Sequence, residues 1–267
     1  MTYTLIRTLA LGTLFFTPAM ALAQDEPASS DEFYGYSTIG LAALPDYEGA
    51  KDLRILPLVD GKVFWGERYI AIEGPAIRAN IINNKTFEFG PIASLTFGRD
   101  DKIKDRAVAQ LGKIKDAYEV GLFGAVSFDI GGNDKLRLGV QGVHDVSSVH
   151  DGFVIAASAT YTAQLGKRLT LMGEIGASYA SDDYARTYFS VAPAGSLGSG
   201  LQVFDAKGGL KDFGAQLTAT YRIGDNWGIA ANAGYKRLAG DFADSPVVAG
   251  GGSANQLSGG VGVFFTF

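Results

Sequence analysis

Long stretches of this chain alternate apolar residues with polar or small ones at a period of two. Residues 169–179 read LTLMGEIGASY, with leucine, isoleucine and tyrosine on one parity and mostly small or polar residues on the other. Successive side chains of a strand point to opposite faces, so this alternation predicts strands with two unlike faces. The pattern recurs over 86–97, 118–130, 135–142, 153–165, 213–222 and 227–236. Most of these segments are longer than the roughly 5–6 residues of a typical soluble strand.

The first residues carry a different signal. Arg7 precedes an apolar stretch from about Leu9 to Ala21, which ends in the small-residue triplet Ala21-Leu22-Ala23. This order is typical of a secretory signal peptide, so we predict that residues 1–23 are removed on export. A membrane-anchoring helix is the alternative, but the stretch is shorter than the ~20 residues that span a bilayer, and Pro18 interrupts it.

The rest of the chain, residues 24–267, offers no apolar run long enough for a transmembrane helix and no cysteine. An exported chain of this kind is either a soluble β-protein or a membrane-spanning barrel. Aromatic residues stand near the ends of the apolar faces, where membrane interfaces would lie: Tyr118, Phe128, Phe153, Tyr161, Phe213, Tyr221, Trp227 and Tyr235. The opposite faces are small and polar, which suits a hydrated lumen better than the core of a sandwich. We therefore predict an all-β, transmembrane, antiparallel up-and-down β-barrel over residues 24–267.

The number of strands follows from the turns. Short polar segments at 82–85, 131–134, 166–168 and 223–226 are expected to be periplasmic turns, and the long segments 98–117, 181–208 and 238–256 to be outer loops. Eleven strands are plain in the sequence, whereas an even number is required. The apolar parity slips around Glu73-Gly74-Pro75, which favours a turn or bulge there. We predict twelve strands, with ten as the alternative.

The chain ends in the strand-patterned sequence LSGGVGVFFTF. One parity, from Leu257 through Val261 to Phe267, is predicted to face lipid, and the other, which includes Phe264, to face inward. A closing strand must pair with the first strand so that neither keeps a free edge in the membrane. A terminal Phe after alternating apolar residues also resembles the signal read by the outer-membrane barrel assembly machinery.

Catalytic and metal-binding patterns are sparse. The segment HDVSSVHD, residues 144–151, contains both histidines of the chain, and a His144/Ser148 pair is the one candidate for nucleophilic catalysis. In an extended strand these residues share a face but lie too far apart for the contact of about 3 Å that proton transfer needs, so a turn would have to bring them together. The favoured interpretation is an outer hairpin in which Asp and Ser cap backbone groups. His144 and His150 have no recognised metal-ligand spacing. We therefore predict no catalytic, cofactor-binding or metal-binding residues.

Two other outer segments carry patterns that predict local structure. Ile103, Ala107, Leu111 and Ile114 recur at helical spacing and predict a short amphipathic helix within residues 100–117. Arg237, Asp241, Asp244 and Ser245 suggest a charge-assisted network that closes the last outer loop.

Several blocks together resemble the MipA/OmpV family of MltA-interacting outer-membrane proteins. They are LPDYEGAKDLRILPLVDGKV at 44–63, GPIASLTFGRDD at 90–101, IKDAYEVGLFGAV at 114–126, DAKGGLKDFGAQLTATYRIGDNW at 205–227 and YKRLAGDFADSPVV at 235–248. The most specific of them runs from Arg237 to Pro246. The resemblance implies an outer-membrane location and, for the best-known member, a scaffold that joins a murein lytic transglycosylase to a bifunctional penicillin-binding protein.

The functional hypothesis is therefore a monomeric, non-enzymatic scaffold for peptidoglycan-remodelling machinery, surrounded by outer-membrane lipid and without a cofactor. A net charge of −5 argues against a nucleic-acid partner. The alternative is a narrow diffusion porin or solute channel, suggested by polar residues on the lumen parity: Glu119, Arg137, Glu174, Gln216, Arg222 and Lys236. A lipid hydrolase built on Ser148 and His144 is the less favoured third hypothesis. Short periplasmic turns and residues 24–32 offer little area for the standard interface of about 800 Å² per partner.

Overall fold

The computed structural model describes residues 33–267 and consists mainly of long strands. The predicted signal peptide, residues 1–23, lies outside the described residues, as do residues 24–32. The strands are β1 Phe33–Pro45, β2 Leu53–Trp65, β3 Arg68–Glu73, β4 Ala76–Asn80, β5 Phe87–Thr96, β6 Ala117–Gly131, β7 Asp134–Asp145, β8 Phe153–Leu165, β9 Leu169–Ala180, β10 Gly209–Arg222, β11 Trp227–Leu238 and β12 Asn255–Thr266.

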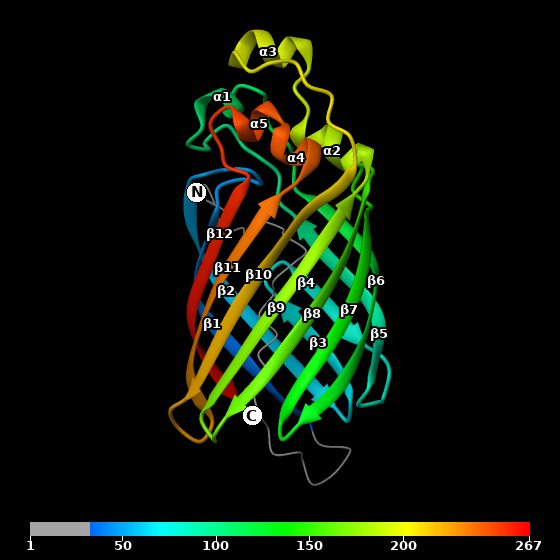
Figure 1. The fold of residues 1–267 in the computed structure, drawn as a ribbon, viewed down its shortest axis with the longest axis vertical. Coiled ribbons are helices and arrows are strands. Elements are labelled where there is room, and N and C mark those ends of the chain that lie inside the picture. Colours follow the sequence, from blue (N-terminus) through cyan, green and yellow to red (C-terminus); the bar gives the residue numbers. More distant parts are fainter. Residues whose placement is uncertain (1–32) are drawn as a thin grey trace, which may run out of the picture.

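Each strand pairs antiparallel with its neighbours in sequence, and β12 pairs with β1 to close the barrel (Figure 1). At the seam, Gly35 and Phe267 exchange both backbone hydrogen bonds, at 2.9 and 3.1 Å. The predicted turn at Gly74-Pro75 separates β3 from β4. The twelve-strand prediction is therefore confirmed and the ten-strand alternative is excluded.

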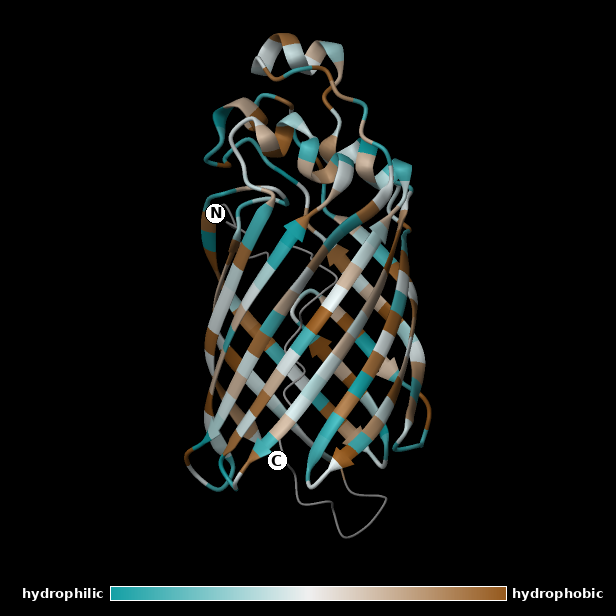
Figure 2. Cartoon of the chain, viewed as in Figure 1, coloured by the Kyte–Doolittle hydropathy of each residue, from teal (hydrophilic) through white to brown (hydrophobic). Residues whose placement is uncertain are grey.

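The two faces of the barrel follow the period-two pattern of the sequence. Apolar and polar residues alternate along the strands, as Figure 2 shows by hydropathy. The aromatic side chains predicted for the membrane interfaces are all exposed on the outer surface, from Trp227 at 39% to Tyr118 at 62%. On β12, Leu257 and Val261 are exposed while Phe264 is buried in the interior, and Phe267, directly after the strand, is exposed, as predicted.

The two ends of the barrel differ. One end, near the C-terminus, carries short turns, and the other carries long loops with all five helices of the described chain (Figure 1). This asymmetry is typical of outer-membrane barrels and assigns the short-turn end to the periplasm. The helices are α1 Arg106–Ala109, α2 Asp182–Phe189, α3 Pro193–Ser199, α4 Gly240–Asp244 and α5 Pro246–Ala249. Within residues 33–267, no helix is long and apolar enough to cross a membrane.

The amphipathic helix predicted within residues 100–117 is mostly wrong. Only the four residues of α1 are helical, capped by the Asp105 carboxylate, and Gly112 then takes a φ of +93° that ends any continuation. Arg99 and Ile114 instead pair as an extended bridge above β5 and β6. Of the apolar positions used for this prediction, Ile103 is buried, and Ala107, Leu111 and Ile114 are partly buried against the core clusters of the outer end.

Candidate functional site

Helices α2, α4 and α5 cover the outer mouth of the barrel (Figure 1). Tyr184 and Phe189 from α2 pack with Phe242 from α4 and Val248 from α5, and each is at most 2% exposed. The Phe189 and Phe242 rings meet edge to face at 5.1 Å between centroids. We call these three helices and their loops the cap. Because its core is apolar, the cap is stabilised by the burial of these side chains away from water.

The predicted charged network among Arg237, Asp241, Asp244 and Ser245 is wrong, because the structure gives Arg237, Asp241 and Ser245 other partners. Arg237 donates to the Asn255 side chain, whereas Asp241 accepts from the backbone N–H of Lys207. The Ser245 hydroxyl donates to the carbonyl of Phe189 and accepts from the N–H of Val247, at the start of α5. The loop is therefore closed mainly by hydrogen bonds from the Asp241 and Ser245 side chains to backbone groups, which sequence spacing does not reveal.

A cluster of buried charges lies directly beneath the cap. Lys211 Nζ is 2.6 Å from Glu48 Oε1 and 3.3 Å from Asp212 Oδ2, and Lys236 Nζ is 3.6 Å from the same Asp212 oxygen. The Tyr184 hydroxyl donates to Glu48 at 2.8 Å. Burial raises the pKa of Tyr184, so this hydroxyl keeps its proton and remains a donor. The cluster thus ties α2 and the β1–β2 loop to strands β10 and β11.

A second polar cluster joins β5, β6 and the β7–β8 hairpin. Glu119 accepts hydrogen bonds from Ser94 at 2.8 Å and Thr96 at 3.0 Å through Oε2. Its other oxygen lies 3.2 Å from His150 Nε2, and His150 Nδ1 accepts from the N–H of Gly152 at 3.0 Å. Because Nδ1 is the acceptor, the hydrogen-bond network assigns the ring proton to Nε2, which donates it to Glu119.

Within residues 33–267, the structure does not join His144 to Ser148, the candidate pair for catalysis. His144 is exposed on the outer face of β7, whereas His150 is buried inside the barrel at 3% exposure. No hydrogen bond among the described residues joins His144 to Ser148. Asp145 instead accepts from the backbone N–H groups of Ser147, Val149, His150 and Asp151. The interpretation of this segment as a capped outer hairpin agrees with these contacts.

Further down the lumen, charged side chains gather on one wall. Arg137 on β7 binds Glu88 on β5 through two hydrogen bonds, at 3.0 and 2.9 Å, and the Tyr69 hydroxyl donates to Glu88 at 2.6 Å. Lys62 on β2 lies over the Tyr69 ring, 4.1 Å from its centroid. A bidentate arginine–carboxylate pair holds both groups in a fixed geometry.

A neighbouring pair extends this charged wall. Arg78 on β4 lies 2.8 Å from Glu73 on β3 and donates to Gln141 on β7 at 3.1 Å. Its guanidinium also lies 5.0 Å from the centroid of the Phe123 ring. Strands β2 to β7 therefore place two ion pairs, Arg137–Glu88 and Arg78–Glu73, on one wall of the lumen together with Lys62. We call this the ion-paired wall.

The opposite wall, on β8 to β12, carries fewer charges at this depth. Its inward positions include Gln216, Thr218, Asn232 and Ser258. The Glu174 carboxylate forms no ion pair within residues 33–267 and instead accepts a hydrogen bond from the Thr160 hydroxyl at 2.7 Å. The lumen residues predicted from parity all lie on inward positions. What the sequence did not predict is the pairing of Arg137 with Glu88 and of Lys236 with Asp212, because these partners come from other strands.

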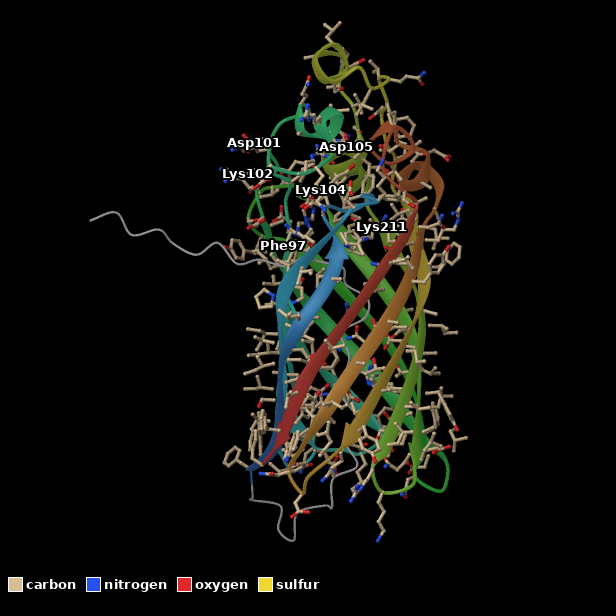
Figure 3. The ribbon with its side chains drawn as sticks, turned by 90° about the vertical axis from the view of Figure 1, so that its left-hand side faces the viewer. Phe97, Asp101, Lys102, Lys104, Asp105 and Lys211 are labelled. Atoms are coloured by element: carbon tan, nitrogen blue, oxygen red, sulfur yellow. The ribbon has the colours of Figure 1, made fainter. Side chains whose placement is uncertain are left out.

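The described chain contains no group of three or more His, Asp or Glu side chains arranged to hold a metal ion. Figure 3 shows the side chains around the barrel, with Lys211 beneath the cap and Asp101, Lys102, Lys104 and Asp105 on the outer loops.

A closed antiparallel barrel with an apolar outer face, aromatic residues at both rims and a charged interior defines a transmembrane β-barrel protein of the outer membrane. The chain belongs to the family described as MltA-interacting protein MipA, whose model matches residues 38–267.

Two curated relatives agree with this location. The outer membrane protein YiaT of Escherichia coli (strain K12) is 31% identical over 104 residues, which is 39% of this chain and 42% of that protein. Outer membrane protein OmpV of Vibrio cholerae (serotype O1) is 31% identical over 144 residues, 52% of this chain and 54% of that protein. The chain thus matches about half the length of these relatives or less.

Two solved structures are similar to this chain at low identity. The COG4313 outer membrane channel from Pseudomonas putida F1 has a TM-score of 0.47 and 11% identity, covering 91% of this chain and 100% of that chain. The NanC porin has a TM-score of 0.45 and 9% identity, covering 86% of this chain and 98% of that chain.

Proposed function

We propose that this protein is a monomeric, non-enzymatic scaffold that holds peptidoglycan-remodelling enzymes at the inner face of the outer membrane. The family description, an MltA-interacting protein, supports this assignment. The partners are a murein lytic transglycosylase and, through it, a penicillin-binding protein. Outer-membrane lipid surrounds the barrel and no cofactor takes part.

The observation that carries this proposal is the contrast between the two ends of the barrel. The outer mouth is covered by the cap, whereas the periplasmic end presents exposed cations on short turns. We call this set the basic rim: Arg68, Lys85, Lys135, Lys167 and Arg168. Within residues 33–267, fewer exposed acids stand beside it, among them Asp129 and Asp225. A cationic rim steers an acidic partner surface toward the barrel and increases the association rate.

The short turns also limit the contact. A standard interface buries about 800 Å² on each partner, which is more than a few turns provide. We therefore infer a compact, salt-sensitive contact, because charge pairs at an exposed rim weaken as ionic strength rises.

The scaffold is tested by crosslinking in cells followed by purification with this protein as bait. The wild type is expected to recover a lytic transglycosylase or a penicillin-binding protein. A double variant with Lys167→Glu and Arg168→Glu is expected to recover several-fold less of that partner. The matched control is Lys51→Glu with Lys115→Glu, two exposed cations on outer loops. All three proteins are first shown to be folded by heat-modifiable migration. Recovery of the folded barrel without an enzyme partner would refute the scaffold.

A second function, the passage of small charged solutes, is favoured by the ion-paired wall of the lumen. Single-channel currents in planar bilayers test it with pure, folded protein. Arg137→Gln leaves Glu88 without its bidentate partner and is expected to shift the ion preference toward cations. Absence of current in the wild type would count against a channel.

The absence of enzymatic activity is part of the proposal. It is supported by the positions of His144 and Ser148, which are both exposed and, among the described residues, are not joined by a hydrogen bond. Any lipid-modifying activity of the purified barrel is expected to be unchanged in Ser148→Ala and His144→Ala. Loss of such an activity in both variants would restore the hydrolase hypothesis.

A further inference from the structure

The barrel wall is incomplete above the β3–β4 hairpin. Strand β2 runs from Leu53 to Trp65, but β3 pairs with it only between Asp60 and Trp65. On its other side the hairpin reaches nearly to the upper end of β5, where Ala76 pairs with Ser94 and the Pro75 carbonyl accepts from the Leu95 N–H, so only β2 extends well above it. The segment from Leu53 to Val59 therefore has β1 on one side and, among residues 33–267, no strand on the other.

The register identifies which backbone groups point into this gap. Gly35 bonds to Phe267 on β12, so the odd residues of β1 bond to β12 and the even residues bond to β2. Across from them, the even residues of β2 bond to β1. The odd residues Ile55, Pro57 and Val59 consequently direct their backbone groups away from β1, toward the gap.

Pro57 fits this position because proline has no N–H to offer a neighbouring strand. In sheets, proline is confined largely to free edges, strand starts and bulges. The sequence thus marks this part of β2 as an edge. Within the described part of the chain, the one hydrogen bond to this edge is at its upper end, where Lys104 Nζ donates to the carbonyl of Leu53 at 3.0 Å.

We call the gap the side window and define it by its borders. Residues 53–59 of β2 form one side, and the Glu73–Ala76 turn forms the bottom. Residues 97–99, which continue the β5–β6 hairpin through the Arg99–Ile114 bridge, form the other side. Lys104 closes the top, with its N–H bonded to Asp46 at 3.1 Å. Figure 3 looks at this side of the barrel, with Phe97 and Lys104 beside the upper end of β2.

The side window lies within the depth of the bilayer. Val59 and Leu53 precede Trp65, at the periplasmic end of β2, by six and twelve residues. With about 3.3 Å per residue and a tilt of about 45°, these residues lie roughly 14 Å and 28 Å above that end. Because the apolar band of such barrels is about 25 Å tall, the side window opens in the outer half of the membrane.

Apolar side chains line both surfaces of β2 here. Ile55 and Val59 point outward and are 71% and 54% exposed. Leu56 and Leu58 point inward and remain partly accessible, next to the small inward residue Ala42 of β1. Arg54 and Asp60 share the inward parity of β2, so Leu56, Leu58 and Ala42 form a short apolar patch beside the side window, between Arg54 above and Asp60 below.

A free sheet edge facing hydrocarbon alone would leave its backbone groups without hydrogen bonds, and such edges are tolerated only where water or protein reaches them. Lumen water reaches this edge if the lumen opens sideways. We propose that the side window is a lateral portal through which an acyl chain of an outer-leaflet lipid enters the lumen and contacts Leu56 and Leu58. The lipid surrounds the barrel at this depth, and the exposed Ile55 and Val59 lead to the opening. This portal is independent of the basic rim and of the scaffold proposed above.

Photo-crosslinking of the full-length protein in its own outer membrane tests the portal. The photoreactive residue p-benzoylphenylalanine replaces Leu58, and in a second variant Leu56. The control replaces Gln216, which also faces inward, on the opposite wall. Leu58 lies seven residues before the end of β2 and Gln216 six before the end of β10, so the depths match. Heat-modifiable migration selects the folded variants, and mass spectrometry identifies the adducts.

The expected result is a lipid adduct at position 58 or 56 that is at least several-fold more abundant than at position 216. Equal lipid adducts at all three positions would overturn the portal, because lipid would then enter by another route. Adducts to residues 24–32 of the chain, or to no lipid at all, would also overturn it, since the edge would be filled by protein or closed to lipid.

Discussion

His150 Nε2 lies 3.2 Å from Glu119 Oε1, and this contact joins the β7–β8 hairpin to strand β6 inside the outer mouth. Both side chains are fully buried. The His150 ring also packs against Tyr184 and Tyr188 of α2, at 5.1 and 5.7 Å between ring centroids. One buried imidazole therefore connects the barrel wall to the cap above it.

Replacement of this histidine is expected to destabilise the barrel. His150→Ala leaves one buried oxygen of Glu119 and the N–H of Gly152 without their partners, a loss of about 1–3 kcal/mol for an unsatisfied buried polar group. The measurement is the urea midpoint of unfolding in lipid vesicles, which falls in proportion to the lost stability.

Two further variants separate the hydrogen bond from general disruption. His150→Gln places an amide donor near Glu119 and is expected to recover part of the loss. His144→Ala removes the exposed histidine of the same hairpin and is expected to leave the midpoint unchanged. If His150→Ala matched the wild type, the contact with Glu119 would have no part in stability.

Lys211 is the central cation of the cluster under the cap. Lys211→Met keeps the length of the side chain but leaves Glu48 without a cation and weakens the pairing of Asp212. Breaking a buried ion pair by removing one partner costs about 3–5 kcal/mol. We expect a lower urea midpoint and faster protease cleavage of the cap loops.

The second partner provides the matched control for Lys211. In the double variant Lys211→Met with Glu48→Gln, the uncompensated charge on Glu48 is gone, so part of the stability should return. Lys207→Met removes an exposed lysine that pairs with Asp205, and exposed pairs contribute only about 0–1 kcal/mol. Equal losses for Lys207→Met and Lys211→Met would contradict the importance of the buried cluster.

Sequence reasoning predicted the barrel because lipid restricts the possible structures. A chain with long alternating strands and no apolar helix must satisfy its backbone in the bilayer by closing a sheet. The lipid-facing parity of β12 and the pairing of its end with β1 follow from that requirement. The aromatic rims were predictable for the same reason, since each aromatic residue ends an apolar face.

The contacts of the cap and lumen were not predictable in the same way. Lys211 and Glu48 are 163 residues apart, and no local pattern indicates that they meet. The helix predicted around Ile103 does not form over its expected length, because Gly112 takes a positive φ and Ile114 pairs with Arg99 in an extended bridge. A sequence signal did exist for the free edge of β2, namely Pro57 within a strand, but its meaning depends on knowing how short β3 is.

Ser245 links two helices of the cap. Its hydroxyl donates to the carbonyl of Phe189, at the end of α2, and caps the N-terminus of α5. Ser245→Ala removes both bonds, and loss of an N-cap alone costs about 0.5–2 kcal/mol. We expect faster protease cleavage in residues 239–254 with little change in the unfolding of the barrel. Ser245→Thr keeps the hydroxyl and should restore protection, and cleavage of Ser245→Ala at the wild-type rate would exclude this role.

The fit of β11 between its two neighbours depends on a glycine opposite an aromatic ring. Gly228 on β11 pairs with Phe264 on β12, whose side chain is fully buried. A methyl group on Gly228 would lie 2.6 Å from the Phe264 ring and 2.2 Å from the carbonyl oxygen of Tyr221 on β10, so Gly228→Ala forces β11 away from its neighbours. Overpacking of this kind costs about 1–3 kcal/mol.

The matched change Gly173→Ala adds a methyl with no atom within 4 Å and is expected to be neutral. Both variants are compared by urea midpoint and by the fraction of protein that reaches the heat-modifiable form. Equal behaviour of the two variants would show that the packing around β11 accommodates the added methyl.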